Sequence, residues 1–355
     1  MKAYSERPRK SLTAVLDAPM HIAIEERPLP EPGPRDVLVQ VMAVGVCGSD
    51  IHFYEHGRIG SKRVEYPFVL GHECAGVVVA VGSEVRGIGV GARVAVEPGI
   101  ACFRCEYCKT GRYNICPNVS FLSAPPVDGA FSQYIVHPEH LLHPIPEKLS
   151  FEEATLIEPL SVGIHACQVG EVKPGMTVVV TGLGPIGLTA VMAAKTFGAS
   201  TIIASDIEPF RLELARRLGA TDVVHAAEQS LSEAAKQATQ GEGADIALDT
   251  TGHPAVLNGI LEALRRGGRV VPIGFPTAEK VPIDLTRMIF GEIRMTPSYR
   301  YANTYPLGIG ILASGAFDAK ALLTDFYDLK HTGEALERAR TNKQSSVKVI
   351  VYPNG

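Results

Sequence analysis

Apolar positions follow two different patterns along the chain, and the change lies near residue 160. Before it, short runs rich in valine and isoleucine alternate with glycine and proline, a pattern typical of irregular β structure. These runs are Val37–Val46, Ala75–Val81 and Ala92–Val96. The proline-rich stretch Pro28–Pro34 predicts an extended connector.

From Thr177 onward, strand, glycine turn and helix repeat in sequence. The predicted strands are Thr177–Thr181, Thr201–Ser205, Asp222–Val224, Ile246–Asp249 and Arg269–Ile273. The predicted helices are Ile186–Phe197, Pro209–Leu218 and Ala255–Leu264. This alternation indicates an α/β domain, a parallel sheet covered by helices on both faces. From Arg300 the pattern returns to mixed β character, and Val347–Tyr352 predicts a last strand that pairs back into the first domain.

Length and composition favour a two-domain enzyme. The chain has 355 residues, which is long for one core, and its net charge of −4 gives no reason to expect nucleic acid as a partner. No apolar run approaches the roughly 20 residues that cross a bilayer. Met1–Ser11 is polar and basic, so we interpret it as a loose leader and not a signal peptide, and we expect a cytoplasmic protein.

A glycine-rich turn follows the strand Thr177–Thr181 and opens the next helix. Its sequence is Gly182-Leu183-Gly184-Pro185-Ile186-Gly187. By itself this pattern also describes an ordinary tight loop, but between a strand and a helix it predicts a dinucleotide site. The first glycine makes the turn, the second lets the backbone approach the pyrophosphate, and the third permits close packing of the helix on the strand.

An acidic residue at the end of the next strand indicates which dinucleotide binds. Asp206 comes nineteen residues after Gly187, where a carboxylate accepts both ribose hydroxyls of NAD and repels the 2′-phosphate of NADP. Arg211 lies nearby and could weaken the preference for NAD by softening the repulsion of the 2′-phosphate. Alternatively, it lies along the adenosine ribose or is a solvated charge on its helix. We also assign to the cofactor the turn after Arg269–Ile273, with Ile273, Gly274 and Phe275.

Four of the seven cysteines are closely spaced. Cys102, Cys105, Cys108 and Cys116 place four thiols within fifteen residues. Four sulfurs complete tetrahedral coordination of Zn²⁺ and leave no position for water, so this spacing predicts a structural zinc. The alternative, four free surface thiols, would be prone to oxidation.

A second set of metal-ligating residues is spread more widely. Cys47, His72, Glu73 and Glu158 are each unremarkable alone, because a lone cysteine is usually buried and a lone glutamate is usually solvated. Together they offer a thiolate, an imidazole and carboxylates. Such a mixed set suits a zinc that keeps one position open for substrate.

These motifs resemble the zinc-dependent medium-chain dehydrogenases. The resemblance runs in the same order over nearly the whole chain from Leu12, through Cys47-Gly48-Ser49-Asp50, Gly71-His72-Glu73 with Gly76, the four cysteines and the glycine turn. Several further stretches are similar to the sorbitol and xylitol dehydrogenase branch. They are His52–Gly60, Gly111–Asn114, Ala124–Gly129, Ile157–Cys167 and Tyr299–Thr304.

The resemblance implies a GroES-like catalytic domain, residues 1–160 and 300–355, with a structural-zinc lobe at about 97–120. It implies a Rossmann NAD-binding domain over residues 161–299, and a homotetramer. It also implies that Cys47, His72 and Glu73 hold a catalytic zinc. In polyol dehydrogenases a glutamate at the position of Glu158 binds zinc directly or through the zinc-bound water, and the sequence leaves both open.

The same resemblance suggests the remaining roles. Zinc acidifies a substrate hydroxyl, NAD accepts the hydride, and Ser49, the cofactor ribose and His52 relay the proton to solvent. Glu158 is the alternative proton acceptor, and His52 is alternatively a plain surface histidine. The predicted substrate contacts are Phe53, Phe121, Glu158, Arg300 and Tyr301. Arg300 is alternatively part of an interdomain salt bridge, and Phe53 stands where this branch usually has a tyrosine.

The sequence therefore predicts an NAD- and zinc-dependent dehydrogenase that oxidises a polyol to a ketose. The nearest competing hypothesis is another zinc-dependent alcohol or threonine-type dehydrogenase. The competing hypothesis from another class is a non-catalytic NAD-binding protein, which the intact zinc-ligand set disfavours.

Overall fold

The computed structural model describes residues 8–276 and 278–355, and the chain forms two compact units. Unit 1 extends to Glu158 and resumes with Leu322–Gly355, whereas unit 2 is Pro159–Ala321. The expected return to the first domain at residue 300 is therefore too early, because residues 300–321 belong to unit 2. Of the predicted leader Met1–Ser11, Met1–Arg7 lies outside the described residues. Lys10 and Ser11 belong to the first strand and not to a loose leader.

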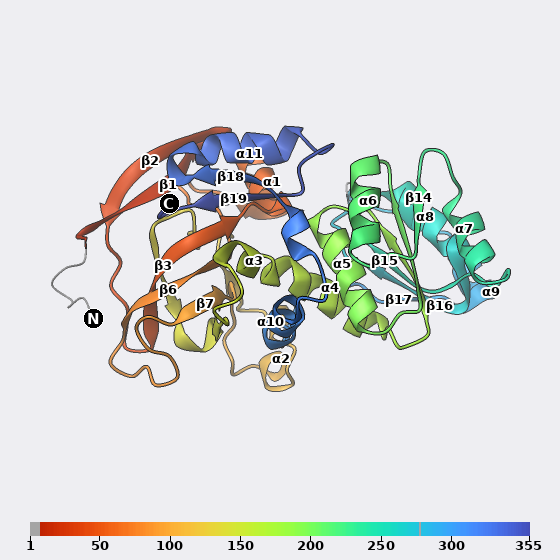
Figure 1. Ribbon diagram of the computed structural model, residues 1–355, viewed down its shortest axis with the longest axis horizontal. Coiled ribbons are helices and arrows are strands. Elements are labelled where there is room, and N and C mark those ends of the chain that lie inside the picture. The colour runs from red at the N-terminus through yellow and green to blue at the C-terminus, as the bar shows by residue number, and fades with distance from the viewer. Residues whose placement is uncertain (1–7, 277) are drawn as a thin grey trace. The chain divides into compact units, whose positions relative to one another are not determined.

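Unit 1 is built on a seven-stranded sheet (Figure 1). Its order is β11-β7-β6-β3-β19-β18, and β10 pairs with β3. The strands are β3 (Asp36–Gly45), β6 (Glu73–Val81), β7 (Arg93–Val96), β10 (Tyr134–Pro138), β11 (Leu142–Pro144), β18 (Leu323–Asp328) and β19 (Lys348–Tyr352). The expectation that the last strand returns to the first domain is confirmed, because β19 pairs antiparallel with β3.

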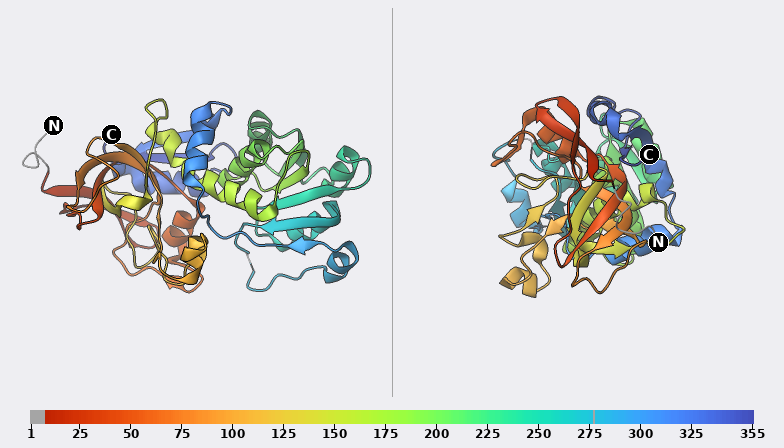
Figure 2. Two further views of the ribbon diagram at one scale, coloured as in Figure 1. Left: turned by 90° about the horizontal axis from the view of Figure 1, so that it is seen from below. Right: turned by 90° about the vertical axis from the view of Figure 1, so that its left-hand side faces the viewer.

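The remaining strands of unit 1 form small two-stranded pieces. β1 (Lys10–Ala18) and β2 (His21–Pro28) make a long antiparallel ribbon (Figures 1 and 2). The short pairs are β4 (Arg58–Ile59) with β5 (Lys62–Arg63), and β8 (Gly99–Ile100) with β9 (Ser120–Phe121). The core between ribbon and sheet is fully buried at Leu16, Val39 and Phe131.

Unit 1 also contains helices, and the sequence pattern had not indicated most of them. They are α1 (Gly48–His56), α2 (Glu106–Lys109), α3 (Phe151–Thr155) and α11 (Thr332–Thr341). α11 packs against β18 and β19 (Figure 1). α3 begins at a capping box in which the Glu153 N–H donates to Ser150 Oγ and the Ser150 N–H donates to Glu153 Oε2.

Unit 2 contains a six-stranded parallel sheet. Its order is β14-β13-β12-β15-β16-β17, so chain order is 3-2-1-4-5-6 across the sheet, the arrangement of a doubly wound dinucleotide fold. The strands are β12 (Thr177–Thr181), β13 (Thr201–Asp206), β14 (Asp222–His225), β15 (Ala244–Asp249), β16 (Leu264–Pro272) and β17 (Arg294–Met295). All five strands predicted here from the sequence are present, with small differences at their ends.

The helices of unit 2 connect these strands. They are α4 (Ile157–Gly170), which begins two residues before the unit, α5 (Pro185–Thr196), α6 (Pro209–Arg217), α7 (Leu231–Ala238), α8 (Pro254–Ala263), α9 (Leu285–Gly291) and α10 (Tyr305–Ser314). α5 and α6 pack near β12 to β14, and α7 and α8 pack against each other (Figure 1). α10 replaces the β character expected after Arg300, since Pro306 in its first turn and Gly315 at its left-handed end favour a helix. No helix in the described part of the chain combines the length and hydropathy of a membrane span.

Candidate metal and cofactor sites

Cys47 stands at the start of α1, at the end of the turn that leaves β3. Its backbone N–H donates to Asp50 Oδ2 at 3.0 Å, which fixes the residue in extended geometry ahead of the helix. The side chain is partly exposed and the thiol is free. The sequence therefore places a fixed, accessible thiol beside the sheet.

His72 and Glu73 come from the neighbouring strand. Both side chains are buried where β6 begins, and Glu73 pairs with Gly45 at the end of β3. One ligand atom from each of Cys47, His72 and Glu73 lies within 4.8 Å of the other two. Cys47 thus meets two residues that follow it by 25 and 26 positions in the chain.

Asp50 connects two of these three residues. It is fully buried, and its Oδ1 accepts hydrogen bonds from the Gly71 N–H at 3.0 Å and the Ser123 hydroxyl at 2.7 Å. His72 Nδ1 lies 3.5 Å from the same oxygen. Burial alone would raise the pKa of Asp50, but the His72 ring and the hydrogen-bond donors hold it below its usual value. Asp50 is therefore a carboxylate that fixes both Cys47 and His72.

Glu73 is paired with a buried lysine. Lys348, at the start of β19, is 1% exposed, and its Nζ donates to Glu73 Oε2 at 2.5 Å. Burial lowers the pKa of Lys348, but Glu73, Cys47 and Glu158 together raise it above its usual value. The other oxygen, Glu73 Oε1, is buried and has no hydrogen-bond partner among the described residues.

The other predicted residues of unit 1 differ in how near they come to this cluster. The Phe121 ring lies 5.4 Å from the His72 ring, and Glu158 is buried and acts electrostatically on Lys348. Phe53 packs in the core with its ring edge toward Phe68, a position that its sequence context did not indicate. Ser49 and His52 lie on α1, partly exposed and exposed respectively.

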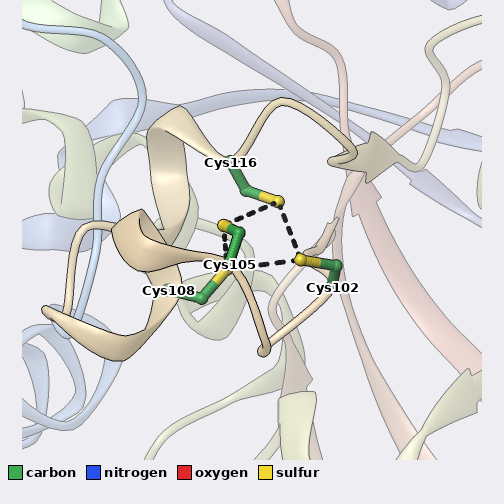
Figure 3. A group of neighbouring side chains, drawn as sticks. All are labelled: Cys102, Cys105, Cys108 and Cys116. Atoms are coloured by element: carbon green, nitrogen blue, oxygen red, sulfur yellow. Dashed lines mark hydrogen bonds between the residues drawn. The ribbon is translucent and has the colours of Figure 1, made fainter.

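Cys102, Cys105, Cys108 and Cys116 bring their sulfurs together in a lobe between β8 and β9 (Figure 3). The Sγ···Sγ distance is 3.4 Å for Cys105–Cys108 and 3.5 Å for Cys102–Cys116. It is 3.9 Å for both Cys102–Cys108 and Cys105–Cys116. A tetrahedron of sulfurs with Zn–S bonds of about 2.3 Å has edges of about 3.8 Å. The thiols are therefore too far apart for disulfides and spaced for one tetrahedral zinc. Backbone N–H groups of Arg104 and Cys105 lower the pKa of Cys102 to about 6, which favours the thiolate.

A buried carboxylate anchors this lobe to the sheet. Glu97 Oε1 accepts from the Tyr113 hydroxyl at 2.6 Å, and Glu97 Oε2 lies 2.8 Å from His143 Nε2. His137 Nε2 lies 2.8 Å from the Glu97 carbonyl. Burial lowers the pKa of His137 to about 4, so the ring is neutral and donates this bond. Tyr113 belongs to the lobe, whereas His137 and His143 belong to β10 and β11.

In unit 2 the glycine-rich turn joins β12 to α5. Gly182 has a φ of +77°, and a Cβ on Gly187 would clash with the Gly182 carbonyl. Gly184 is the N-cap of α5, and no described atom lies within 4 Å of where its Cβ would be. Pro185 occupies the first helical turn. The Thr250 hydroxyl donates to the Gly182 carbonyl at 2.7 Å. The turn therefore leaves the N-terminus of α5 open toward a ligand.

Asp206 lies beside this turn at the end of β13. Its Oδ2 accepts from the Leu183 N–H at 2.5 Å, and its Oδ1 accepts from Ile207 and Glu208. Arg211 Nε is buried without a hydrogen-bond partner in the described part of the chain. The turn with Ile273, Gly274 and Phe275 follows β16, and its first two N–H groups donate to the Asp249 carbonyl. All these groups lie at the carboxyl ends of the parallel strands, where such folds bind ligands.

Arg300 and Tyr301 lie in unit 2. Arg300 has a φ of +51°, and its guanidinium lies 5.0 Å from the centre of the Tyr299 ring. Tyr301 is buried with its ring 5.8 Å from that of Tyr305.

The sequence analysis missed Lys348, Asp50, Glu97 and Thr250. Lys348 is a charged residue at the start of an otherwise apolar terminal strand, and this pattern can indicate a buried ion pair. Asp50 was quoted only as part of a motif. The partners of Glu97 and Thr250 are distant in sequence, and nothing in the sequence indicates them.

Comparison with known proteins identifies the relatives of this chain. The alcohol dehydrogenase GroES-like domain family matches residues 33–147, and the zinc-binding dehydrogenase family matches residues 185–314. A sorbitol dehydrogenase from Bacillus subtilis is 51% identical over 98% of each chain. A probable D-xylulose reductase A from Neosartorya fischeri is 40% identical over 96% of each chain.

A solved structure shares the fold throughout. A short chain alcohol dehydrogenase from Escherichia coli, solved with its cofactor NADH, superposes with a TM-score of 0.89 at 30% identity over 97% of this chain and 99% of that one. The predicted fold class, a Rossmann sheet with a β-rich GroES-like domain, is confirmed, as is the prediction of a dehydrogenase enzyme. This chain belongs to the zinc-binding alcohol dehydrogenases with a GroES-like domain.

Proposed function

We propose that this protein oxidises a secondary hydroxyl of a polyol to a ketone and transfers the hydride to NAD⁺. The observation that carries the proposal is the convergence of Cys47, His72 and Glu73, where Glu73 Oε1 is buried and has no hydrogen-bond partner in the described part of the chain. The polyol is supported by relatives named for sorbitol, D-xylulose and L-idonate, at 38–51% identity.

The donor set of this cluster fits a catalytic zinc. Cys47, His72 and Glu73 supply three protein ligands of the types that Zn²⁺ binds, which leaves a fourth position for substrate. Because His72 Nδ1 faces Asp50, its Nε2 is the nitrogen that would be available to hold the metal. Zinc held there would supply Lewis acidity toward a substrate hydroxyl.

The residues around the donors orient them and move the proton. Asp50 fixes the Cys47 backbone and the His72 ring. Ser49 and His52 lie on the first turns of the helix that Cys47 precedes, partly exposed and exposed, and they are the proposed proton relay. Glu158 is the alternative proton acceptor. Its buried carboxylate lies close enough to the cluster to raise the pKa of Lys348, as Glu73 does.

The second zinc is structural. Cys102, Cys105, Cys108 and Cys116 provide four sulfurs and leave no open position. Such a zinc stabilises the lobe, and the Glu97 network ties it to the sheet.

NAD binds at the glycine-rich turn of unit 2. The N-terminus of α5 receives the pyrophosphate, and Asp206 receives the adenosine ribose, which disfavours the 2′-phosphate of NADP. Arg211 lies on α6 and is the residue that would weaken this preference. The further proposed contacts come from Gly182, Gly184, Pro185, Ile186, Gly187, Ile273, Gly274 and Phe275.

The substrate contacts are proposed with different degrees of support in each unit. Phe121 lies against His72 and forms an apolar wall. Phe53 is buried in the core of unit 1 and is proposed as a second apolar contact. Arg300 and Tyr301 would bind the remaining hydroxyls from unit 2.

We further propose a cytoplasmic homotetramer. All seven cysteines are free, which suits a reducing compartment. The tetramer follows from the resemblance to polyol dehydrogenases and is tested by light scattering of the purified protein.

Steady-state kinetics test the function. The substrates are sorbitol, xylitol, ribitol, galactitol and threonine, each with NAD⁺ and NADP⁺, with Cys47→Ala as the inactive control. We expect ketose formation from at least one polyol, with NAD⁺ preferred, and two zinc ions per chain by elemental analysis. Turnover of threonine alone would assign the chain to a threonine-type dehydrogenase, and one zinc with no turnover would support a non-catalytic protein.

A further inference from the structure

Lys348 is a charged side chain enclosed in the core of unit 1. It is 1% exposed, and its Nζ donates to Glu73 Oε2 at 2.5 Å and to the Val46 carbonyl at 3.0 Å. Burying an ammonium group costs several kcal/mol unless it is paired with good geometry. Its partners are Glu73, a proposed zinc ligand, and the carbonyl of Val46, which precedes the proposed ligand Cys47. Lys348 therefore contacts the residues that build the cluster.

The bond from Lys348 divides the roles of the two Glu73 oxygens. Oε2 is occupied by the ammonium group, whereas Oε1 is buried without a hydrogen-bond partner in the described residues. A buried carboxylate oxygen without a partner carries a desolvation cost. A metal beside Cys47 and His72 would satisfy that oxygen, and the lysine would keep the other one from binding it.

The backbone around Lys348 also sets the position of Cys47. The Val46 N–H donates to the Val349 carbonyl at 2.9 Å, and the Lys348 ammonium binds the carbonyl of the same Val46. β19 therefore holds the residue before Cys47 from both of its backbone groups. Lys348 contacts the Glu73 carboxylate and the Cys47 turn at once.

Gly45 makes room for this pair. A Cβ at Gly45 would clash with Glu73 Oε2 and would lie 3.2 Å from the Lys348 side chain. Any larger residue would push the carboxylate away from the ammonium group. The absence of a side chain at position 45 is thus a condition for the Glu73–Lys348 bond.

We infer that Lys348 is a positioning residue for the catalytic zinc: it binds Glu73 Oε2, leaves Oε1 as the single donor oxygen, and offsets the negative charge of the thiolate and carboxylate. This inference rests on the proposed zinc site. It assigns to the terminal strand, far from the other ligands in sequence, a direct part in building that site.

Zinc affinity of a lysine variant tests the inference. Lys348→Met keeps the length of the side chain and removes the charge, and Lys348→Arg keeps the charge. Loss of a partner that orients a metal ligand typically costs 10- to 100-fold in metal affinity. We expect Lys348→Met to bind the catalytic zinc about 10- to 100-fold more weakly in competition with a chromophoric chelator, with the structural zinc retained and affinity partly restored in Lys348→Arg.

Lys343→Met is the matched control, because Lys343 is exposed and five residues earlier in the chain. It should bind zinc like the unaltered protein. Unchanged or tighter binding of the catalytic zinc by Lys348→Met would overturn the inference, since the lysine would then be neutral or repel the metal.

Cobalt substitution provides a readout of coordination. In Lys348→Met both oxygens of Glu73 are free, so Co²⁺ at this site should gain a ligand and its visible d–d bands should weaken. Gly45→Ala crowds both Glu73 Oε2 and the Lys348 side chain, so it disturbs their bond without removing either charged group, and it keeps the test decisive if Lys348→Met does not fold. The expected result is the same loss of zinc affinity, and normal zinc affinity in Gly45→Ala would contradict the assigned geometry.

These measurements separate the inference from the proposed function. Zinc and cobalt binding need no polyol, so they are measured whether or not a substrate is known. If the unaltered protein binds a single zinc at its four cysteines, the proposed function fails together with its zinc site. If it binds two and Lys348→Met binds both equally well, only the role of Lys348 fails.

Discussion

Asp50 shows how one buried carboxylate organises several backbone groups. Its two oxygens accept from the N–H groups of Cys47 and Gly71 and from the Ser123 hydroxyl, and the last two of these bonds are fully buried. Since every donor points at the carboxylate, the site needs an acceptor at both oxygens. This requirement follows from geometry that is invisible in the sequence.

Asp50→Asn should therefore disturb the site although it conserves shape. The amide NH₂ group would face either the Cys47 N–H or both the Gly71 N–H and the Ser123 hydroxyl, and would leave at least one donor unpaired, at a cost of about 1–3 kcal/mol in the free energy of unfolding. Urea unfolding of the zinc-loaded protein measures this loss. Ser123→Ala is the control, which removes one donor and should cost only about 1 kcal/mol. Equal stability of Asp50→Asn and the unaltered protein would refute the assignment of these bonds.

The carboxylate of Asp206 has a comparable place in unit 2. Asp206→Asn keeps an acceptor but removes the charge that disfavours a 2′-phosphate and that strengthens hydrogen bonds from the ribose. A hydrogen bond to a charged group contributes about 1.5–3 kcal/mol, so we expect the KM for NAD⁺ to rise roughly 10- to 100-fold while that for NADP⁺ falls. Initial rates with both cofactors measure the ratio. An unchanged ratio would show that Asp206 does not set the preference.

Whole elements were predicted well where their pattern is periodic and local. The strands β12 to β16 alternate with helices, and glycine or proline marks most of the boundaries, so the sequence alone was sufficient for the strands. The helix α7 was missed, because no glycine or proline separates it from β14. The apolar helix α10 was misassigned, because the run from Leu307 to Leu312 contains glycines and resembles a buried strand. α1 was missed as well, since its Ser49–Asp50 start is polar and its buried residues are few.

The same contrast applies to the sites. The four cysteines and the glycine turn are contiguous motifs, and their spacing is fixed by one ligand, so the sequence is informative. Lys348 and Glu97 act through partners on other strands, and no local pattern records a pairing that the sheet creates. The position of Phe53 in a motif predicts a substrate contact, and its edge-on packing against Phe68 adds a core role that the sequence did not indicate.

The strands β10 and β11 carry histidines that make unit 1 sensitive to acid. His137 is fully buried, with Glu97, His140 and His143 as the charged and titratable groups that act on it, and its pKa falls from 6.5 to about 4. Between these values the unfolded chain binds a proton at His137 that the folded chain does not. Stability is therefore lost as the pH falls through this window, by up to about 3 kcal/mol.

His137→Gln retains a donor toward the Glu97 carbonyl and does not titrate. It should lose less stability than the unaltered protein between pH 6.5 and pH 4, by up to about 3 kcal/mol, in urea unfolding at matched zinc content. His56→Gln is the control, because His56 is exposed and should leave the pH dependence unchanged. Parallel stability curves for His137→Gln and the unaltered protein would contradict a neutral, buried His137.

At the scale of the whole molecule, the two kinds of cofactor site belong to different units. All proposed zinc donors, from Cys47 to Cys116, lie in unit 1, whereas the glycine turn and Asp206 lie in unit 2. The chain reaches this division by leaving unit 1 at Glu158 and returning at Leu322. The terminal strand β19 thus completes the first sheet and supplies Lys348, so the end of the chain is needed for the zinc site near its beginning.

This division predicts where each ligand stabilises the chain. A ligand at 100 times its Kd stabilises the folded state by about 2.7 kcal/mol, which slows exchange through global opening about 100-fold. Hydrogen exchange should therefore slow in β12 and β13 when NAD⁺ is added. Removal of zinc by a chelator should speed exchange in residues 102–116 and at the start of α1, while β12 and β13 keep their protection, since they belong to unit 2. Equal loss of protection in both units on chelation would mean that the zinc sites stabilise the molecule as one cooperative block.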